Sequence, residues 1–271
     1  MQCKLSVIGT GKMGTAIIKG LLDQRILSAS DITGADASDQ ARQAFLALDP
    51  HGALHWAATP AAAVRDADVA LLAVKPQNMA ELLPQLRAAN DRTLFISIAA
   101  GITLARLEAA LGADRPMFRV MPNTPLMVGE GVTACAANGR VAASHHEILQ
   151  AIFGVTGRVF TVSEPQLDAV TALSGSGPAF FALIADRFAQ AAVAEGLPAA
   201  LALPMALQTM RGTAALLTVS GMTPEQLITQ VSSKGGTTVA GLEVLRNGAL
   251  ADLLAATISA AANRSRELSK V

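Results

Sequence analysis

A glycine-rich hexamer near the start of the chain has the chemistry of a phosphate cradle. It reads Gly9-Thr10-Gly11-Lys12-Met13-Gly14 and lies between an apolar run and an expected helix. The first glycine permits a tight turn, the second lets the backbone approach a pyrophosphate, and the third lets the helix lie close to the strand. N–H groups at the positive end of the helix then face the phosphates. This context favours a dinucleotide site, with all six residues as cofactor-binding candidates, over a purely structural turn.

Asp36 follows the next expected strand, 22 residues beyond Gly14. A carboxylate at this position hydrogen-bonds a ribose diol and repels a 2′-phosphate, which favours NAD over NADP. Two alternatives stay open. The first is that Asp36 is a solvated turn residue. The second is that Ser38 and Lys12 accept a 2′-phosphate nearby.

Small and polar residues follow three further expected strands. In sheets of alternating strands and helices, ligands bind outside the carboxyl ends of the strands. The candidates are Lys75 and Pro76 after one strand, Ile98, Ala99 and Ala100 after the next, and Asn123 after the third. The small side chains leave room for a nicotinamide ring, and an asparagine amide offers both a donor and an acceptor. For Lys75, a solvated surface lysine is an equal alternative.

Two stretches in the second half combine hydroxyls, glycines and an expected helix start. They are Ser174-Gly175-Ser176-Gly177-Pro178-Ala179 and Val231-Ser232-Ser233-Lys234-Gly235-Gly236-Thr237-Thr238. Free N–H groups at a helix start form a nest for an anion. One helix end contributes only about 0.3–1 kcal/mol to an exposed anion, so holding a carboxylate takes several N–H bonds. A single loop of this kind is better explained by ordinary capping, but two favour a substrate site, with Ser176 as a candidate in the first.

The residues that most dehydrogenases use for proton transfer are missing from these positions. All four histidines lie in the first half, outside the strand ends, and no histidine or cysteine cluster has the spacing of a metal site. The second half has only two lysines, Lys234 and Lys270. A reductase without an obvious acid or base suits a protonated imine, which needs mainly to be held in place and shielded from water.

Charge and composition narrow the class of partner. The 271 residues carry 21 basic and 21 acidic side chains without a basic run, which argues against nucleic acid or an anionic membrane as the main partner. Hydrophobic residues make up 51% of the chain, an excess that indicates a large interface with a second subunit.

The cysteines and the apolar stretches favour a cytoplasmic protein. Cys3 and Cys135 are far apart in apolar contexts, as expected for a reduced pair. Lys4 interrupts the N-terminal apolar run, so no secretory signal is expected. The stretch from Ala169 to Ala185 is broken by glycine and proline and is shorter than the roughly 20 residues of a membrane span, so none is predicted.

Two kinds of segment must position these residues. Strands are expected at Cys3–Gly9, Asp31–Ala35, Asp68–Val74, Thr93–Ile98 and Met117–Met121, alternating with helices. This order predicts an α/β fold with a doubly wound, Rossmann-type parallel sheet over residues 1–163. Residues 164–271 show only helical spacing and predict an all-helical domain for substrate binding and dimerisation, with helices beginning near Pro178, Pro198 and Pro224.

Six motifs occur in a characteristic order: GTGKMG, LAVKPQ, SIAAG, RVMPNTP, DAVTALSGSGPA and VSSKGGTTVAGLEVL. On these motifs the chain resembles the pyrroline-5-carboxylate reductases over nearly its whole length, and the last motif is the most specific. Two departures occur. Arg246 stands where the family usually has an acidic, amide or lysine side chain, and Lys12 replaces a common asparagine or glutamine, which bears on cofactor binding.

The resemblance implies reduction of 1-pyrroline-5-carboxylate to L-proline by NADPH, with NADH as an alternative, in proline biosynthesis. It also implies a homodimer, with dimers that often assemble into a decamer. At matching positions it implies a substrate carboxylate site at Ser233, Gly236, Thr237 and Thr238. The Thr238 hydroxyl would also reach the ring nitrogen and relay its proton, as the catalytic residue. The family's tendency towards NADPH conflicts with Asp36.

Two other functions fit parts of the pattern. A 3-hydroxyacid or 6-phosphogluconate-type dehydrogenase shares the glycine turn and a helical second domain, but the helical lysine of that class is missing here. A nucleotide-binding module without turnover would keep the fold and bind the cofactor only.

Overall fold

The computed structural model describes residues 3–269, and its contacts divide the chain into two compact units. The sheet unit comprises the residues up to Ser176 together with those from Ala261 onward. The helical unit comprises Gly177–Ala260. Residues 164–176 therefore group with the sheet unit by their contacts. The domain boundary expected after residue 163 stays a prediction.

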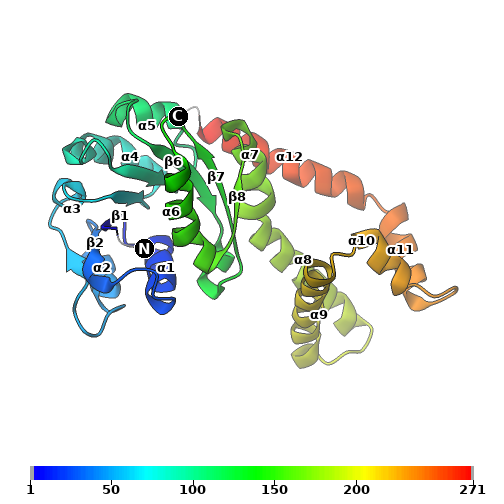
Figure 1. Ribbon diagram of the computed structural model, residues 1–271. Helices are drawn as coiled ribbons and strands as arrows, with labels where there is room; N and C mark the ends of the chain where they lie inside the picture. Colours follow the sequence, from blue (N-terminus) through cyan, green and yellow to red (C-terminus); the bar gives the residue numbers. More distant parts are fainter. Residues whose placement is uncertain (1–2, 270–271) are drawn as a thin grey trace. The chain divides into compact units, whose positions relative to one another are not determined.

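An eight-stranded sheet forms the centre of the sheet unit, in the order β3-β2-β1-β4-β5-β6-β7-β8 (Figure 1). Neighbouring strands are parallel except β6 and β7, which are antiparallel. The strands are β1 (Leu5–Ile8), β2 (Ile32–Ala35), β3 (His55–Trp56), β4 (Val69–Leu72), β5 (Leu94–Ser97), β6 (Met117–Pro122), β7 (Gly131–Ala137) and β8 (Gly157–Thr161). The carboxyl ends of β1, β4, β5 and β6 therefore meet at one edge of the sheet, where ligands bind in such folds.

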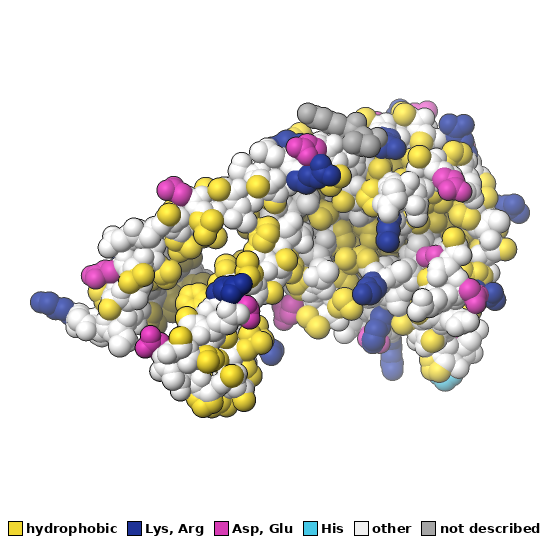
Figure 2. Space-filling model, turned by 180° about the vertical axis from the view of Figure 1, so that it is seen from behind, with side chains coloured by type: hydrophobic (Ala, Val, Ile, Leu, Met, Phe, Trp, Pro, Cys, Tyr) yellow, Lys and Arg dark blue, Asp and Glu magenta, His cyan; other side chains and the backbone are white. Residues whose placement is uncertain are grey.

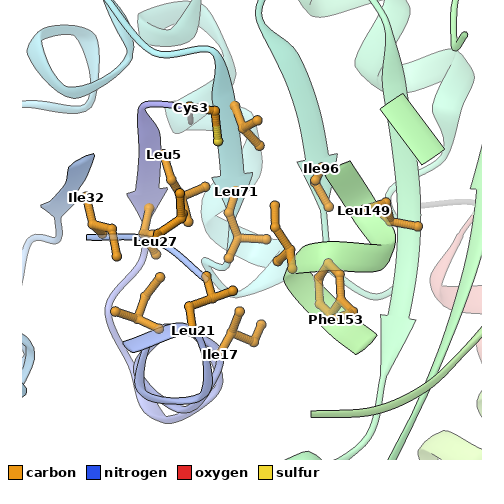
Figure 3. Packing of buried hydrophobic residues seen from close by; sticks show 14 of the residues in the cluster. Cys3, Leu5, Ile17, Leu21, Leu27, Ile32, Leu71, Ile96, Leu149 and Phe153 are labelled. Atoms are coloured by element: carbon orange, nitrogen blue, oxygen red, sulfur yellow. The ribbon is translucent and has the colours of Figure 1, made fainter. Parts of the chain in front are cut away.

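Two hydrophobic clusters, one on each face of the sheet, pack the helices against it. Alternate strand residues enter opposite clusters, as Leu71 and Leu72 of β4 do. Figure 3 shows Ile17 and Leu21 of α1 packed with Leu5, while Phe153 belongs to α6 in the same cluster. The helices of this unit are α1 (Lys12–Asp23), α2 (Asp39–Leu46), α3 (Pro60–Val64), α4 (Met79–Leu82), α5 (Leu104–Leu111), α6 (Ala143–Phe153) and α7 (Leu167–Val170).

Short helices complete the sheet unit. They are the 3₁₀ segments η1 (Ala29–Asp31), η2 (Pro76–Asn78), η3 (Leu83–Ala88), η4 (Thr124–Val128), η5 (Gly154–Thr156) and η6 (Glu164–Gln166), and the π-helical segment η7 (Thr171–Gly175).

The helical unit consists of α8 (Gly177–Ala194), α9 (Ala199–Ser220), α10 (Pro224–Gln230), α11 (Thr237–Asn247) and the first part of α12 (Leu250–Leu268). Helices begin at the three expected prolines, with Pro198 as the N-cap of α9 and Pro224 as the first residue of α10. Large apolar side chains stay exposed on this unit, Phe181 and Phe188 by 54% and 59%, and Figure 2 shows apolar side chains over its surface. Exposed apolar side chains of this kind are typical of a surface that binds another protein chain.

The helical stretch Glu164–Ala194 is long and apolar enough to cross a membrane by length and composition. Core helices of soluble proteins meet the same criteria, so one such helix is weak evidence for a span. The expectation that none exists stays a prediction.

The predicted fold class is confirmed, and all five expected strands are present. Three strands escaped prediction. β3 has only two residues, β7 is built largely of glycine and alanine, which have low strand propensity, and β8 is an edge strand with exposed side chains. The pair β6–β7 makes the sheet mixed rather than fully parallel.

Candidate active site

The glycine turn between β1 and α1 has the close contacts that its sequence predicts. Gly9 has φ +98°, and a Cβ there would lie 2.6 Å from the carbonyl carbon of Ala73, just after β4. A Cβ on Gly14 would collide with the Gly9 carbonyl oxygen. Gly11 is the N-cap of α1, forms no side-chain cap, and has nothing within 4 Å of a Cβ position. The turn is thus packed on its inner side and open at the helix start.

Asp36 fixes the shape of this turn. Its Oδ2 accepts a hydrogen bond from the Thr10 N–H at 2.8 Å, and its Oδ1 accepts one from the Ser38 N–H at 2.8 Å. The Thr15 hydroxyl adds a bond to the Thr10 carbonyl at 2.7 Å. Asp36 therefore joins the ends of β1 and β2, a role that the sequence did not reveal.

A cavity of about 1000 Å³ opens beside the turn, entirely within the sheet unit. Thr10, Gly11 and Lys12 line it from the turn, Ser38 from the N-cap of α2, and Met127 from η4. Lys12 and Ser38 are both exposed. The structure thus brings together the two residues named as an alternative phosphate site, whereas Asp36 is not among the lining residues.

The carboxyl ends of β4 and β5 lie side by side. Ile98 N–H donates to the Leu72 carbonyl at 3.0 Å, which joins the ends of β4 and β5. Lys75 is exposed and is the N-cap of η2, which begins at Pro76. Ala99 is buried, whereas Ile98 and Ala100 are half-buried.

Asn123, after β6, is buried, and both polar atoms of its amide have partners inside the protein. Nδ2 donates to the Ser174 carbonyl at 3.0 Å, and Oδ1 accepts from the Val132 N–H at 2.8 Å. The amide thereby brings the first hydroxyl-rich stretch to the end of β6. Ser176, at the end of this stretch, is half-buried, and its N–H donates to the Thr171 carbonyl at 2.8 Å.

The second hydroxyl-rich stretch forms a tight loop in the helical unit, between α10 and α11. Gly235 has φ +69°, and the Gly236 N–H donates to the Ser233 carbonyl at 2.9 Å. Gly236 is the N-cap of α11 without a side-chain cap. Thr237 is exposed and Thr238 half-buried in the first turn of this helix, so hydroxyls and N–H groups gather at an uncapped helix start.

The histidines at the start of α6 have structural partners. His145 Nδ1 accepts the Ala142 N–H at 3.0 Å, and burial, then the neighbouring His146, lowers the pKa of His145. His146 packs edge-on against Phe118, with ring centroids 5.0 Å apart. Among residues 3–269, no three His, Cys, Asp or Glu side chains are grouped to hold a metal ion.

Comparison with known proteins gives matches along the whole chain. A family model described as pyrroline-5-carboxylate reductase dimerisation matches residues 164–268, and one described as NADP oxidoreductase, coenzyme F420-dependent, matches residues 4–101. A pyrroline-5-carboxylate reductase of Synechocystis is 38% identical over 100% of this chain and 100% of that protein. One of Pisum sativum is 37% identical over 98% of this chain and 96% of that protein.

Two solved structures are similar over nearly the same extent. The structure of a pyrroline-5-carboxylate reductase from Coxiella burnetii has a TM-score of 0.94 at 32% identity and covers 100% of both chains. That of a pyrroline carboxylate reductase from Plasmodium falciparum with NADP bound has a TM-score of 0.85 at 27% identity, covering 99% of this chain and 98% of that one.

Proposed function

Because this chain belongs to the pyrroline-5-carboxylate reductase family, we propose that two helix starts with glycine N-caps, those of α1 and α11, bind the two reactants. The chain is an NAD(P)H-dependent oxidoreductase that reduces 1-pyrroline-5-carboxylate to L-proline. The start of α1 holds the cofactor, and the start of α11 holds the imino acid.

The residues of the glycine turn fit a dinucleotide. The open side of Gly11 admits a pyrophosphate to the N–H groups of α1, and Lys12 adds a cation in the same cavity. Lys75 and Pro76 after β4, and Ile98, Ala99 and Ala100 after β5, surround the nicotinamide end. When bound, NADPH supplies the hydride that forms the new C–H bond at the imine carbon, while the electron pair of the C=N bond moves to nitrogen.

The loop before α11 fits the substrate carboxylate. Ser233, Gly236 and Thr237 offer hydroxyl and N–H donors at a helix start that no side chain caps, and the helix end itself favours an anion. Thr238 directs its hydroxyl to the ring nitrogen and relays the proton there. This combination of an uncapped helix start with three hydroxyls is the observation that carries the assignment.

We also propose a homodimer formed by the helical unit, with dimers assembling into a decamer, and a cytoplasmic location. Support for the dimer comes from the dimerisation family model over residues 164–268 and from the exposed apolar side chains of α8 and α9. Cys3 and Cys135 are buried free thiols, as suits a reducing compartment.

The test is the loss of reduced-nicotinamide absorbance after 1-pyrroline-5-carboxylate is added, with NADPH and NADH in turn. Turnover with at least one cofactor is expected. Tight cofactor binding without turnover would instead identify a nucleotide-binding module.

Thr238→Ala tests the substrate loop. We expect kcat/KM for the imine to fall at least about tenfold, because a hydrogen bond to a charged group is removed, while NADPH affinity stays within about twofold. Thr229→Ala is the matched control, since that hydroxyl bonds only the Glu225 carbonyl of its own helix. An equal loss of cofactor affinity in Thr238→Ala would refute the assignment.

A further inference from the structure

One buried amide connects the end of β6 with two other segments of the sheet unit. Asn123 is 7% exposed, and its two hydrogen bonds reach the Ser174 carbonyl at 3.0 Å and the Val132 N–H at 2.8 Å. The first partner belongs to η7, and the second belongs to β7. A single side chain therefore fixes the spacing of three backbone segments at the edge of the sheet where the cofactor site lies.

The carbonyl that Asn123 contacts lacks its usual helical partner. In an α-helix the Ser174 carbonyl would accept from residue 178, but Pro178 has no N–H. The chain widens instead into a π-helical turn, in which the Ser176 N–H donates to the Thr171 carbonyl at 2.8 Å. The Asn123 amide supplies a donor where the proline removes one. Such π-helical turns occur frequently at functional sites.

Close packing fixes the same stretch a second time. A Cβ on Gly175 would lie 2.5 Å from the Cε of Met121 on β6, so the glycine lets the stretch lie against this side chain without displacing it. Ser174, Gly175 and Ser176 thus lie against the end of β6 through one hydrogen bond and one contact with a methionine side chain, within the sheet unit.

We propose that Asn123 is a positioning residue of the reductase, which holds the Ser174–Ser176 stretch beside the nicotinamide end of the cofactor site and does not itself bind the cofactor. The inference rests on the proposed function, because this stretch matters to the reaction only if an imino acid is reduced beside it. Both polar atoms of the Asn123 amide have partners within the protein, and the proposal takes the place of the sequence-based expectation that Asn123 binds the cofactor.

In Asn123→Asp the hydrogen bond from Val132 is kept in both protonation states, whereas the bond to Ser174 forms only when the new carboxyl group is protonated. The carboxylate still accepts from Val132, but it repels the Ser174 carbonyl; the protonated acid donates to that carbonyl as the amide does. Burial raises the pKa of such a carboxyl group. The elements joined here carry few charged side chains, namely Arg119 on β6, its partner Glu164, and Glu130 before β7, and η4 and η7 carry none.

The expected result is a kcat, relative to wild type at the same pH, that is at least about tenfold lower near pH 9 and recovers towards pH 6. The dissociation constant for NADPH should stay within about twofold of wild type at both pH values. Asn138→Asp is the matched control. That asparagine bridges the start of the same strand, through the Met117 N–H and the Glu108 carboxylate. The kcat of the Asn138→Asp enzyme, relative to wild type at the same pH, should not rise towards pH 6.

Four outcomes would overturn the inference while wild type remains active. A loss of NADPH affinity equal to the loss of kcat would make Asn123 a cofactor ligand. A pH-independent loss, or wild-type activity at every pH, would show that the Ser174 bond does not matter. Loss of the circular dichroism signal near pH 9, even with saturating NADPH, would leave Asn123 a purely structural bridge. Absence of turnover in wild type would instead refute the proposed function.

Discussion

Asp36→Ser tests two roles of one carboxylate at once. The side chain accepts two backbone N–H groups, from Thr10 and Ser38, both at 2.8 Å, and it stands at the strand end where a carboxylate meets the ribose in dinucleotide-binding folds. The first role concerns the shape of the glycine turn and affects both cofactors equally. The second concerns only the difference between a ribose hydroxyl and a 2′-phosphate.

The two effects have different sizes and different readouts. A hydrogen bond to a charged group contributes about 1.5–3 kcal/mol, and loss of the Thr10 bond should weaken both NADH and NADPH by about tenfold. One unit charge about 4 Å from a 2′-phosphate costs about 1 kcal/mol in water and more at lower dielectric. For a half-exposed site we expect the NADPH/NADH ratio of kcat/KM to rise roughly five- to thirtyfold in the variant.

The assay measures kcat/KM and the dissociation constant for each cofactor at fixed salt. Asp39→Ser is the matched control, because Asp39 is exposed in the first turn of α2 and its ion pair with Arg42 is long, at 3.8 Å. It should change neither affinity nor ratio by more than about twofold. An unchanged ratio in Asp36→Ser, with both affinities reduced, would refute a role in discriminating cofactors and leave Asp36 as a support of the turn. Unchanged affinities for both NADH and NADPH would refute the role of Asp36 as a support of the turn.

Four further changes test other parts of the structure. Gly9→Ala should abolish cofactor binding in calorimetry, since φ is +98° and a Cβ meets the backbone after β4; retained binding would show that the turn can shift. Arg119→Met should lower the free energy of unfolding by about 2 kcal/mol in urea, because it removes the charged partner of Glu164 at 3.1 Å and leaves that carboxylate with the Leu104 N–H; a change below about 1 kcal/mol would contradict this. Phe188→Glu, on the exposed face of α8, should give monomers in sedimentation, unlike a wild-type dimer. Burial raises the pKa of the Cys3 thiol to about 11, so as the pH rises the thiol loses its proton in the unfolded chain before it does so in the folded protein. The free energy of unfolding should therefore fall between about pH 9 and 11, more steeply in wild type than in Cys3→Ala.

The cofactor turn could be predicted because each glycine acts through its own backbone. A positive φ at Gly9 and a short approach at Gly14 follow from residue type and spacing alone. The existence of β1, β4 and β5 could be predicted from local sequence too, since they are mainly apolar runs buried on both faces.

Partners across the fold could not be predicted in the same way. The sequence marks Asp36 as a carboxylate at a strand end, but its bond to Thr10 spans 26 residues and depends on how β1 and β2 are paired. The sequence likewise marks Asn123 as a donor and acceptor, whereas its partner Ser174 lies 51 residues away in a π-helical turn. Pro178 was a usable signal for that turn, because it removes the N–H that the Ser174 carbonyl would have taken.

Glycine N-caps mark the two candidate binding sites, whereas α4, α6, α7 and α9 begin without a side-chain cap on other residues. Serine or threonine side chains cap α2, α3, α5 and α10, through Ser38, Thr59, Thr103 and Thr223. The starts of α1 and α11 have glycine instead, Gly11 and Gly236, and neither has a side-chain cap. A cap satisfies N–H groups that would otherwise bind an anion, so a helix start without a cap leaves those N–H groups free. The ligands proposed for them, a cofactor pyrophosphate and a substrate carboxylate, are both anions. Glycine at these two N-caps therefore leaves each helix start open to an anion, as the proposed function requires.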